Sequence, residues 1–300
     1  MINFILYNIL FIWVIFVDKT HKNIGSVVAV LDTGIYPHRD FGNRILEFQD
    51  FVNNRAYAYD DNSHGTHVAG IIAGDGTASN GKYCGLAPNS RIIALKVLDR
   101  NGEGNTADVV TGLRWVMMNR ERFDIRIVNL SFGTTAKASM GSDSLLIQVV
   151  ERVWDEGIVV VTAAGNNGPA KGTITVPGIS RKVITVGAFD DAMYTDERGI
   201  KHINYSGRGP TKECIVKPEI VTAGSGIVSC ANQKDRYSVK SGTSMSAPIV
   251  TAAVALLLER YPHMTPAMVK MRLHDRAVKL KLSKEHQGWG MLDLKELLRP

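Results

Sequence analysis

Cysteine is scarce in this sequence, which has only Cys84, Cys214 and Cys230 among its 300 residues. The number is odd and no C-x-x-C pair occurs, so the sequence indicates neither a disulfide framework nor a zinc site. None of the three stands in a motif with a base, which argues against a cysteine nucleophile. We therefore expect reduced, largely buried thiols, which favour a reducing compartment.

Long basic runs are missing as well. The net charge is +6, but the Lys and Arg residues are scattered and are not interleaved with aromatic side chains. We interpret them as solvated surface and expect no nucleic-acid partner. The sequence also has no internal repeat or low-complexity linker, so its 45% hydrophobic residues predict one large domain.

The N-terminal segment, residues 1–22, is set apart from a main domain at 23–300. Residues 1–17 are almost wholly apolar, and the positive charges follow them without a small-residue cleavage site, which is atypical of a signal peptide. Seventeen residues reach the lower limit for spanning a bilayer. Three interpretations stay open, namely a membrane-associated segment, a packed helix and a remnant of a differently started gene. We expect a cytoplasmic or membrane-associated protein rather than a secreted one.

Apolar runs and helical patterns alternate from residue 24 onward. The predicted strands are 27–31, 91–97, 127–130, 158–162 and 183–186. The predicted helices are 64–73, 106–119, 143–156, 244–260, 266–277 and 292–298. This alternation predicts an α/β three-layer sandwich, with a mostly parallel central β-sheet flanked by helices. In such sheets the active site lies at the carboxyl ends of the strands.

A run of small residues, G-T-S-M-S-A-P at 242–248, leads into an apolar helix pattern. Ser244 is therefore expected in the first turn of a buried helix. Unpaired N–H groups and the helix dipole favour an oxyanion at such a place. Because Ser and Thr are also ordinary N-caps, the run is not evidence of catalysis by itself.

Two upstream stretches supply what a serine nucleophile lacks. The strand pattern at 28–32 ends on Asp32, and His64 opens a helix of small residues. A serine hydroxyl needs a base to take its proton, and that base needs a third group to fix its tautomer. Asp32, His64 and Ser244 provide these three groups in that chain order.

Together these motifs resemble the subtilisin family of serine peptidases over about residues 27–298. The run G-K-Y-C-G-L-A-P at 81–88 is similar to the intracellular alkaline branch of that family. The resemblance implies that Asp32 orients, His64 is the general base and acid, and Ser244 attacks. Asn166, in A-A-G-N at 163–166, matches the oxyanion donor by resemblance, although an Asn-Gly turn needs no functional reason.

The resemblance also implies a protein or peptide substrate, held as an extended strand between two segments. Glycine in such segments lets another backbone approach closely. Ala164 and Gly165 are expected to form a wall of the pocket for the residue before the cut. The expected substrate-binding residues are Gly102, Gly104, Ser131, Phe132, Gly133, Ala164 and Gly165. Phe132 is as readily interpreted as core packing.

No cofactor is required for this chemistry. Structural calcium is common in the family, and Asp40 and residues 60–62 are oxygen-rich, but the loop at 75–81 does not reproduce the strongest calcium site, so the ligands stay unassigned. His64 and His67 have metal-pair spacing without a third ligand, so we interpret His67 as a packed histidine. The resemblance also implies a propeptide before the catalytic domain, and we expect residues 1–22 to be too short to form one.

The function predicted from the sequence is a serine endopeptidase that works through an acyl-enzyme intermediate. One alternative is a catalytically inactive homologue that binds peptides without cutting them. A second is an esterase, but that fold places its serine in a G-x-S-x-G elbow before the acid and the histidine, and the order here is the reverse.

Overall fold

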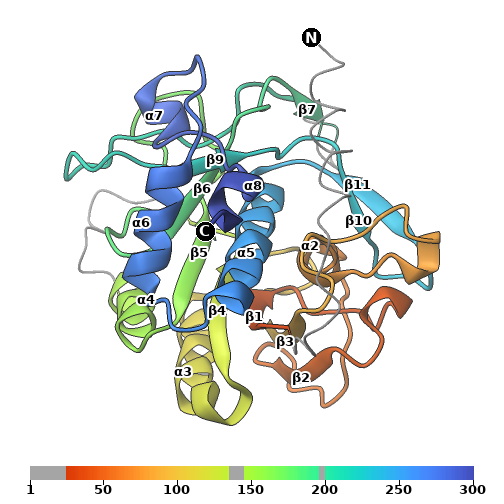
Figure 1. Cartoon of the computed structure of the whole chain (residues 1–300). Helices are drawn as coiled ribbons and strands as arrows, with labels where there is room; N and C mark the ends of the chain where they lie inside the picture. The colour runs from red at the N-terminus through yellow and green to blue at the C-terminus, as the bar shows by residue number, and fades with distance from the viewer. Residues whose placement is uncertain (1–24, 135–144, 196–198, 200) are drawn as a thin grey trace.

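A seven-stranded sheet forms the centre of the computed structural model, which describes residues 25–134, 145–195, 199 and 201–300 (Figure 1). The strand order is β2-β3-β1-β4-β5-β6-β9, and every neighbouring pair is parallel. The strands are β1 (Val27–Asp32), β2 (Ile45–Asp50), β3 (Arg91–Lys96), β4 (Ile125–Leu130), β5 (Val159–Ala163), β6 (Ile184–Ala188) and β9 (Ile220–Thr222). The predicted parallel sheet is confirmed.

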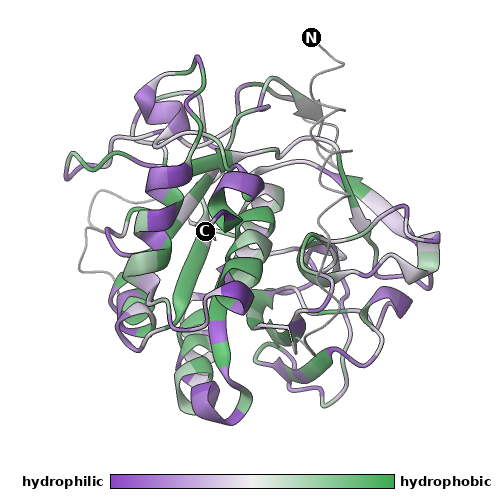
Figure 2. Ribbon diagram, in the orientation of Figure 1, coloured by the Kyte–Doolittle hydropathy of each residue, from purple (hydrophilic) through white to green (hydrophobic). Residues whose placement is uncertain are grey.

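Two pairs of helices pack against this sheet. The helices α2 (His64–Ala73) and α5 (Thr243–Arg260) contact each other, and α5 lies along β4, β5 and β6. The helices α3 (Thr106–Phe123) and α4 (Leu145–Asp155) form the second pair, α3 against β1 and β4 and α4 against β5. All six residues of β1 are buried, which requires cover on both faces of the sheet. The three-layer sandwich is confirmed, and its apolar centre is visible in Figure 2.

Shorter elements surround these layers. They are the helices α6 (Pro266–Arg276), α7 (Lys284–Gln287) and α8 (Leu294–Leu298), the 3-10 helices η2 (Arg39–Phe41) and η3 (Thr77–Ser79), and the strand pairs β7 (Tyr194–Thr195) with β8 (Lys201–His202) and β10 (Ile227–Cys230) with β11 (Tyr237–Lys240). The β10–β11 hairpin packs against α2. It therefore lies beside the helix that His64 begins.

The sequence patterns located most elements to within a few residues. The predicted helix 64–73 is found with those bounds, and Thr265 caps α6 by accepting from the Met268 N–H. The edge strand β2 was missed, because its residues are mixed polar and apolar and mostly half-buried, without a continuous apolar run. The start of the predicted helix 143–156 lies outside the described residues.

The expectation of largely buried thiols is wrong for two of the three cysteines. All three are free, but only Cys230, at the end of β10, is buried. Cys84 and Cys214 are exposed, and each lies on a segment between helices and strands.

The segment 1–22 lies outside the described residues, so its predicted membrane contact stays a prediction. Within the described part of the chain, no helix combines the length and the apolar character that crossing a membrane requires.

Candidate active site

Three predicted site residues meet at the carboxyl edge of the sheet. Asp32 ends β1, Ser131 follows β4, and Asn166 lies three residues beyond β5. These strands are consecutive neighbours in the sheet. Because neighbouring strands lie about 4.8 Å apart, the outer two are separated by roughly 10 Å. Residues more than 130 positions apart in the chain are thereby brought to one edge.

Asp32 and His64 form a direct hydrogen bond. Asp32 Oδ1 lies 2.7 Å from His64 Nδ1, and the same oxygen accepts from the Thr33 N–H at 2.8 Å. The Asp32 side chain is 1% exposed and that of His64 is 23% exposed. Burial lowers the pKa of His64, but the Asp32 carboxylate outweighs burial and holds that pKa above its ordinary value. The imidazole is therefore oriented, and its charged form is stabilised.

The close contact between β1 and α2 depends on Gly65. A Cβ at this position would lie 2.2 Å from the carbonyl oxygen of Gly34 and 3.1 Å from the Asp32 Cβ. Any larger residue would push the start of α2 away from β1. The glycine after His64 thus allows the imidazole to reach the carboxylate.

Asp60 also holds the end of β1 and the start of α2 together. Its carboxylate accepts from the hydroxyls of Thr33 at 2.9 Å and Thr66 at 2.6 Å, and from the Ser63 N–H at 2.9 Å. Burial raises the pKa of Asp60, but these hydrogen bonds outweigh burial and the pKa is lowered. Both carboxylate oxygens accept hydrogen bonds from the protein, so Asp60 links the end of β1 to the start of α2.

Lys96 is a functional candidate that the sequence analysis missed. Its buried ammonium, at the end of β3, donates to the Thr33 carbonyl at 2.7 Å and to the Leu98 carbonyl at 2.9 Å, and it pairs with Asp61 at 2.7 Å. It therefore joins the end of β1, the approach to His64 and the loop after β3. The sequence A-L-K at a strand end carried no signal of this, because a lysine there is normally interpreted as solvated.

Asn166 is held by the residue that precedes Ser244. Asn166 Oδ1 accepts from both the backbone N–H and the hydroxyl of Thr243, each at 3.0 Å. The Thr243 hydroxyl in turn accepts from the Gly165 N–H at 3.1 Å. The amide oxygen is thus engaged, and the NH₂ group remains as the donor. Thr243 was not predicted to have a role, and its only signal was its place in the G-T-S motif.

Ser244 is the second residue of α5, where backbone N–H groups lack helical partners. Its helix packs against α2, which begins with His64. Among the described residues, the Ser244 hydroxyl forms no hydrogen bond. Catalytic hydrogen bonds are often loose without substrate and tighten when it binds. The hydroxyl is therefore not committed to another role.

Of the expected substrate-binding residues, Gly133 and Gly165 share a neighbour. A Cβ at either position would lie within 2.4 Å of the Thr175 side chain, at 2.2 Å and 2.4 Å respectively. Ala164 is buried, and its carbonyl accepts from the Thr175 N–H at 3.0 Å. The ends of β4 and β5 are therefore backed by one segment, and only glycine fits on both sides of it.

The remaining residues of that set lie in different environments. Gly102 is exposed, and a Cβ there would be 3.7 Å from Asn62 Nδ2, so the loop containing Gly102 and Gly104 lies against the approach to His64. Ser131 is buried, and its hydroxyl accepts a hydrogen bond from Asn129 Nδ2 at 2.9 Å. Phe132 packs against the hydrophobic core. Their part in substrate binding stays a prediction.

The candidate calcium position Asp40 is occupied by protein donors. Its carboxylate accepts from the Ala78 N–H and from the Tyr237 hydroxyl, each at 2.7 Å. Among the described residues, His38, Asp40 and Cys230 form a buried group whose ligand atoms lie within 4.8 Å of one another. We assign no ion to this group, and the predicted calcium ligands stay unassigned.

His67 is buried, as predicted for a packed histidine. Its Nε2 lies 3.1 Å from both the Ile227 and the Ser238 carbonyl oxygens. Burial lowers its pKa to about 3, and the positive charge of Lys240 acts in the same direction. The ring is therefore neutral and joins α2 to the β10–β11 hairpin.

Comparison with known proteins agrees with this geometry. The profile described as "Subtilase family" matches residues 23–290. Serine protease AprX of Bacillus subtilis (strain 168) is 41% identical over 86% of this chain, which spans only 62% of that protein. Subtilisin DY of Bacillus licheniformis is 33% identical, with 91% of each chain covered.

The fold agrees as well. A crystal structure of a cold adapted subtilisin-like serine proteinase superimposes with a TM-score of 0.71 at 29% identity, covering 89% of this chain and 88% of that one. The profile match, the relatives and the shared architecture lead to one conclusion. The chain belongs to the subtilase family.

Proposed function

We propose that this chain is a serine endopeptidase that hydrolyses peptide bonds through an acyl-enzyme. The observation that carries the proposal is the 2.7 Å hydrogen bond between Asp32 and His64, at the sheet edge beside the start of α5. In the first step His64 Nε2 takes the Ser244 proton while Ser244 Oγ attacks the substrate carbonyl. Asp32 fixes Nδ1 as the protonated nitrogen and stabilises the imidazolium.

The tetrahedral intermediate that follows carries a negative oxygen. In the proposed mechanism it accepts hydrogen bonds from Asn166 Nδ2 and from the Ser244 N–H. The two donors from Thr243 to Asn166 Oδ1 support this assignment, because they leave Nδ2 as the free end of the amide. His64 then protonates the leaving amine, and water attacks the acyl-enzyme with His64 again acting as base.

The proposed substrate is a protein or peptide in extended form. It lies between the loop with Gly102 and Gly104 and the segment from Ser131 to Gly133, and Ala164 and Gly165 bound the pocket before the cut. The residues above supply every proton transfer, so the proposed chemistry requires no cofactor. Any calcium would stabilise the fold rather than take part in the reaction.

The test compares two serines of the same motif. The purified chain should cleave casein and be labelled by a fluorophosphonate, and Ser244→Ala should abolish both. Ser246→Ala is the matched control, because that hydroxyl is already engaged with the Ala223 carbonyl at 3.0 Å. A folded chain with neither activity would favour the inactive peptide-binding homologue, and turnover of esters alone would favour an esterase.

The proposed catalytic domain is 23–300, and residues 1–22 are a separate segment. For location we propose the cytoplasm or its membrane surface. Fractionating cells that express the chain with and without residues 1–17 tests this, and recovery of both forms outside the cells would contradict it.

A further inference from the structure

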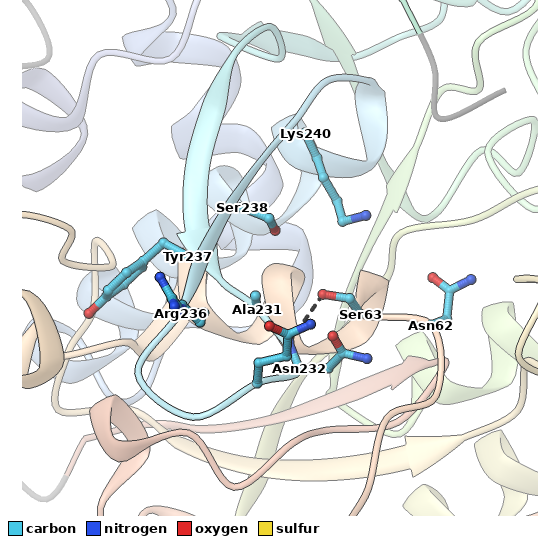
Figure 3. A pocket seen from close by; sticks show the side chains of 9 residues that line it. Asn62, Ser63, Ala231, Asn232, Arg236, Tyr237, Ser238 and Lys240 are labelled. Carbon is cyan, nitrogen blue, oxygen red and sulfur yellow. Dashed lines mark hydrogen bonds between the residues drawn. The ribbon is translucent and has the colours of Figure 1, made fainter. Parts of the chain in front are cut away.

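A polar cavity of about 430 Å³ lies beside the start of α2, outside the segments assigned to substrate above. One wall is formed by Asn62 and Ser63 (Figure 3). The other is formed by residues of the β10–β11 hairpin, namely Ala231, Asn232, Gln233, Arg236, Tyr237, Ser238 and Lys240. The Asn232 N–H donates to Ser63 Oγ at 3.2 Å and joins the two walls. The volume is large enough for an amino-acid side chain.

The lining of this cavity is positively charged. It contains Arg236 and Lys240 and no acidic residue. The Arg236 side chain is exposed and forms no hydrogen bond or ion pair within the described part of the chain. Three acids adjoin this lining in the described chain. Asp235 pairs with Arg39 at 3.4 Å, Asp61 pairs with a buried lysine at 2.7 Å, and Asp40 accepts from the Tyr237 hydroxyl at 2.7 Å. A lining with two cationic side chains and no carboxylate of its own favours an anion.

The position of the cavity relates it to one half of a substrate. Ser63 directly precedes His64, and the positive charge of Lys240 acts to lower the pKa of His64. Figure 1 shows β10 and β11 on the opposite side of α2 from β5, whose end leads to Asn166. The acyl half of the substrate is proposed to lie toward Asn166. The leaving half, whose amine His64 protonates, then extends toward the cavity.

We propose that Arg236 and Lys240 select substrates that carry an acidic side chain within the first three residues after the scissile bond. The inference rests on the proposed endopeptidase function and names a substrate class for the same site. A carboxylate in the cavity is attracted by both cations. The amide groups of Asn62 and Asn232 hold the wall, because they donate to the Arg100 and Asp60 carbonyls at 2.9 Å and 3.0 Å. A lysine at the same substrate position is repelled.

The test uses internally quenched peptides of one sequence with amidated C-termini. Glu, Gln or Lys is placed in turn at the first, second and third residue after the cut. At low salt, kcat/KM for Glu should exceed that for Gln by about three- to tenfold at one or more of these positions, as expected for a partly exposed charge pair, and Lys should fall below Gln. Added salt should reduce the preference.

Two variants identify the cause. In Arg236→Gln/Lys240→Gln the ratio of Glu to Gln should fall to about one. Lys234→Gln is the matched control, because this exposed lysine of the same hairpin does not line the cavity, and it should keep the ratio. Equal rates for Glu and Gln at all three positions, or an equal preference in the double variant, would overturn the inference.

An acyl anilide separates this inference from the proposed function, because its leaving group carries no residue after the cut. A folded chain that cleaves neither the anilide nor any peptide contradicts the endopeptidase itself. Cleavage of the anilide together with indifference to the Glu, Gln and Lys peptides contradicts only the acidic selection.

Discussion

The two histidines of α2 lie one turn apart and have opposite surroundings. His64 contacts the Asp32 carboxylate and is partly exposed, and its pKa is raised. His67 contacts two backbone carbonyls and is fully buried, and burial lowers its pKa to about 3. Both residues are histidines, and they lie three positions apart in the same helix. The difference indicates that one carboxylate and access to solvent distinguish the histidine proposed as general base from a structural one.

His67 also helps to hold α2, and with it His64, in place. His67 fastens α2 to the β10–β11 hairpin, and Asp60 fastens it to the end of β1. With the helix held at both places, the position of His64 is set before any substrate arrives. The structural histidine thereby supports the one proposed to be catalytic.

The largest expected effect comes from giving His64 a neutral neighbour, as His67 has. Asp32→Asn removes the charge and the tautomer control, so kcat should fall by about 10⁴-fold, as in other triads of this kind. The pKa of His64 should fall toward or below its ordinary value. Steady-state kinetics over a pH series check both, and a kcat within tenfold of the unchanged chain would contradict the assignment.

A smaller effect is expected when the proposed oxyanion donor is replaced and both histidines are unchanged. Asn166→Ala should lower kcat by about 10²–10³-fold with little change in KM. Because His64 keeps its carboxylate, the pH dependence of kcat/KM should be unchanged. A shift of the pH profile would instead indicate that Asn166 acts through His64.

The surroundings of His67 predict a pH-dependent stability. Its folded pKa of about 3 lies below the unfolded value near 6.5, so this contribution is complete above pH 6.5 and is lost as the pH falls toward 3. Within that window the free energy of unfolding should fall by about 1.4 kcal/mol per pH unit for this one group. Urea unfolding of the Ser244→Ala chain at several pH values measures the slope. In the same background His67→Gln should reduce the slope of the free energy of unfolding against pH. An unaltered slope would show that groups other than His67 cause the acid sensitivity.

The smallest effect concerns Lys240, whose positive charge acts on both histidines. Lys240 lowers the pKa of each, so Lys240→Gln should raise the pKa of His64. The acid limb of kcat/KM should then move to higher pH, because a larger fraction of His64 is protonated at a given pH. A limb that moves to lower pH would show that Lys240 acts through a contact rather than through its charge.

Much of this arrangement could be predicted from the sequence. The motifs around Asp32, His64 and Ser244 are local, and the buried strands and helices that carry them have clear apolar patterns. What could not be predicted depends on distant pairs. The contacts of Asn166 with Thr243, and of Lys96 with Thr33 and Asp61, join residues from 35 to 77 positions apart, which no local pattern records.

Whether Asp32, His64 and Ser244 act together is measured by the rate at which a fluorophosphonate phosphonylates the chain, with the adduct located by mass spectrometry. One adduct is expected, on Ser244, formed at a rate that rises with pH as His64 loses its proton. His64→Ala should slow this reaction by about 10³-fold or more. An adduct on another residue, or an equal rate in His64→Ala, would contradict the claim that Asp32, His64 and Ser244 act together.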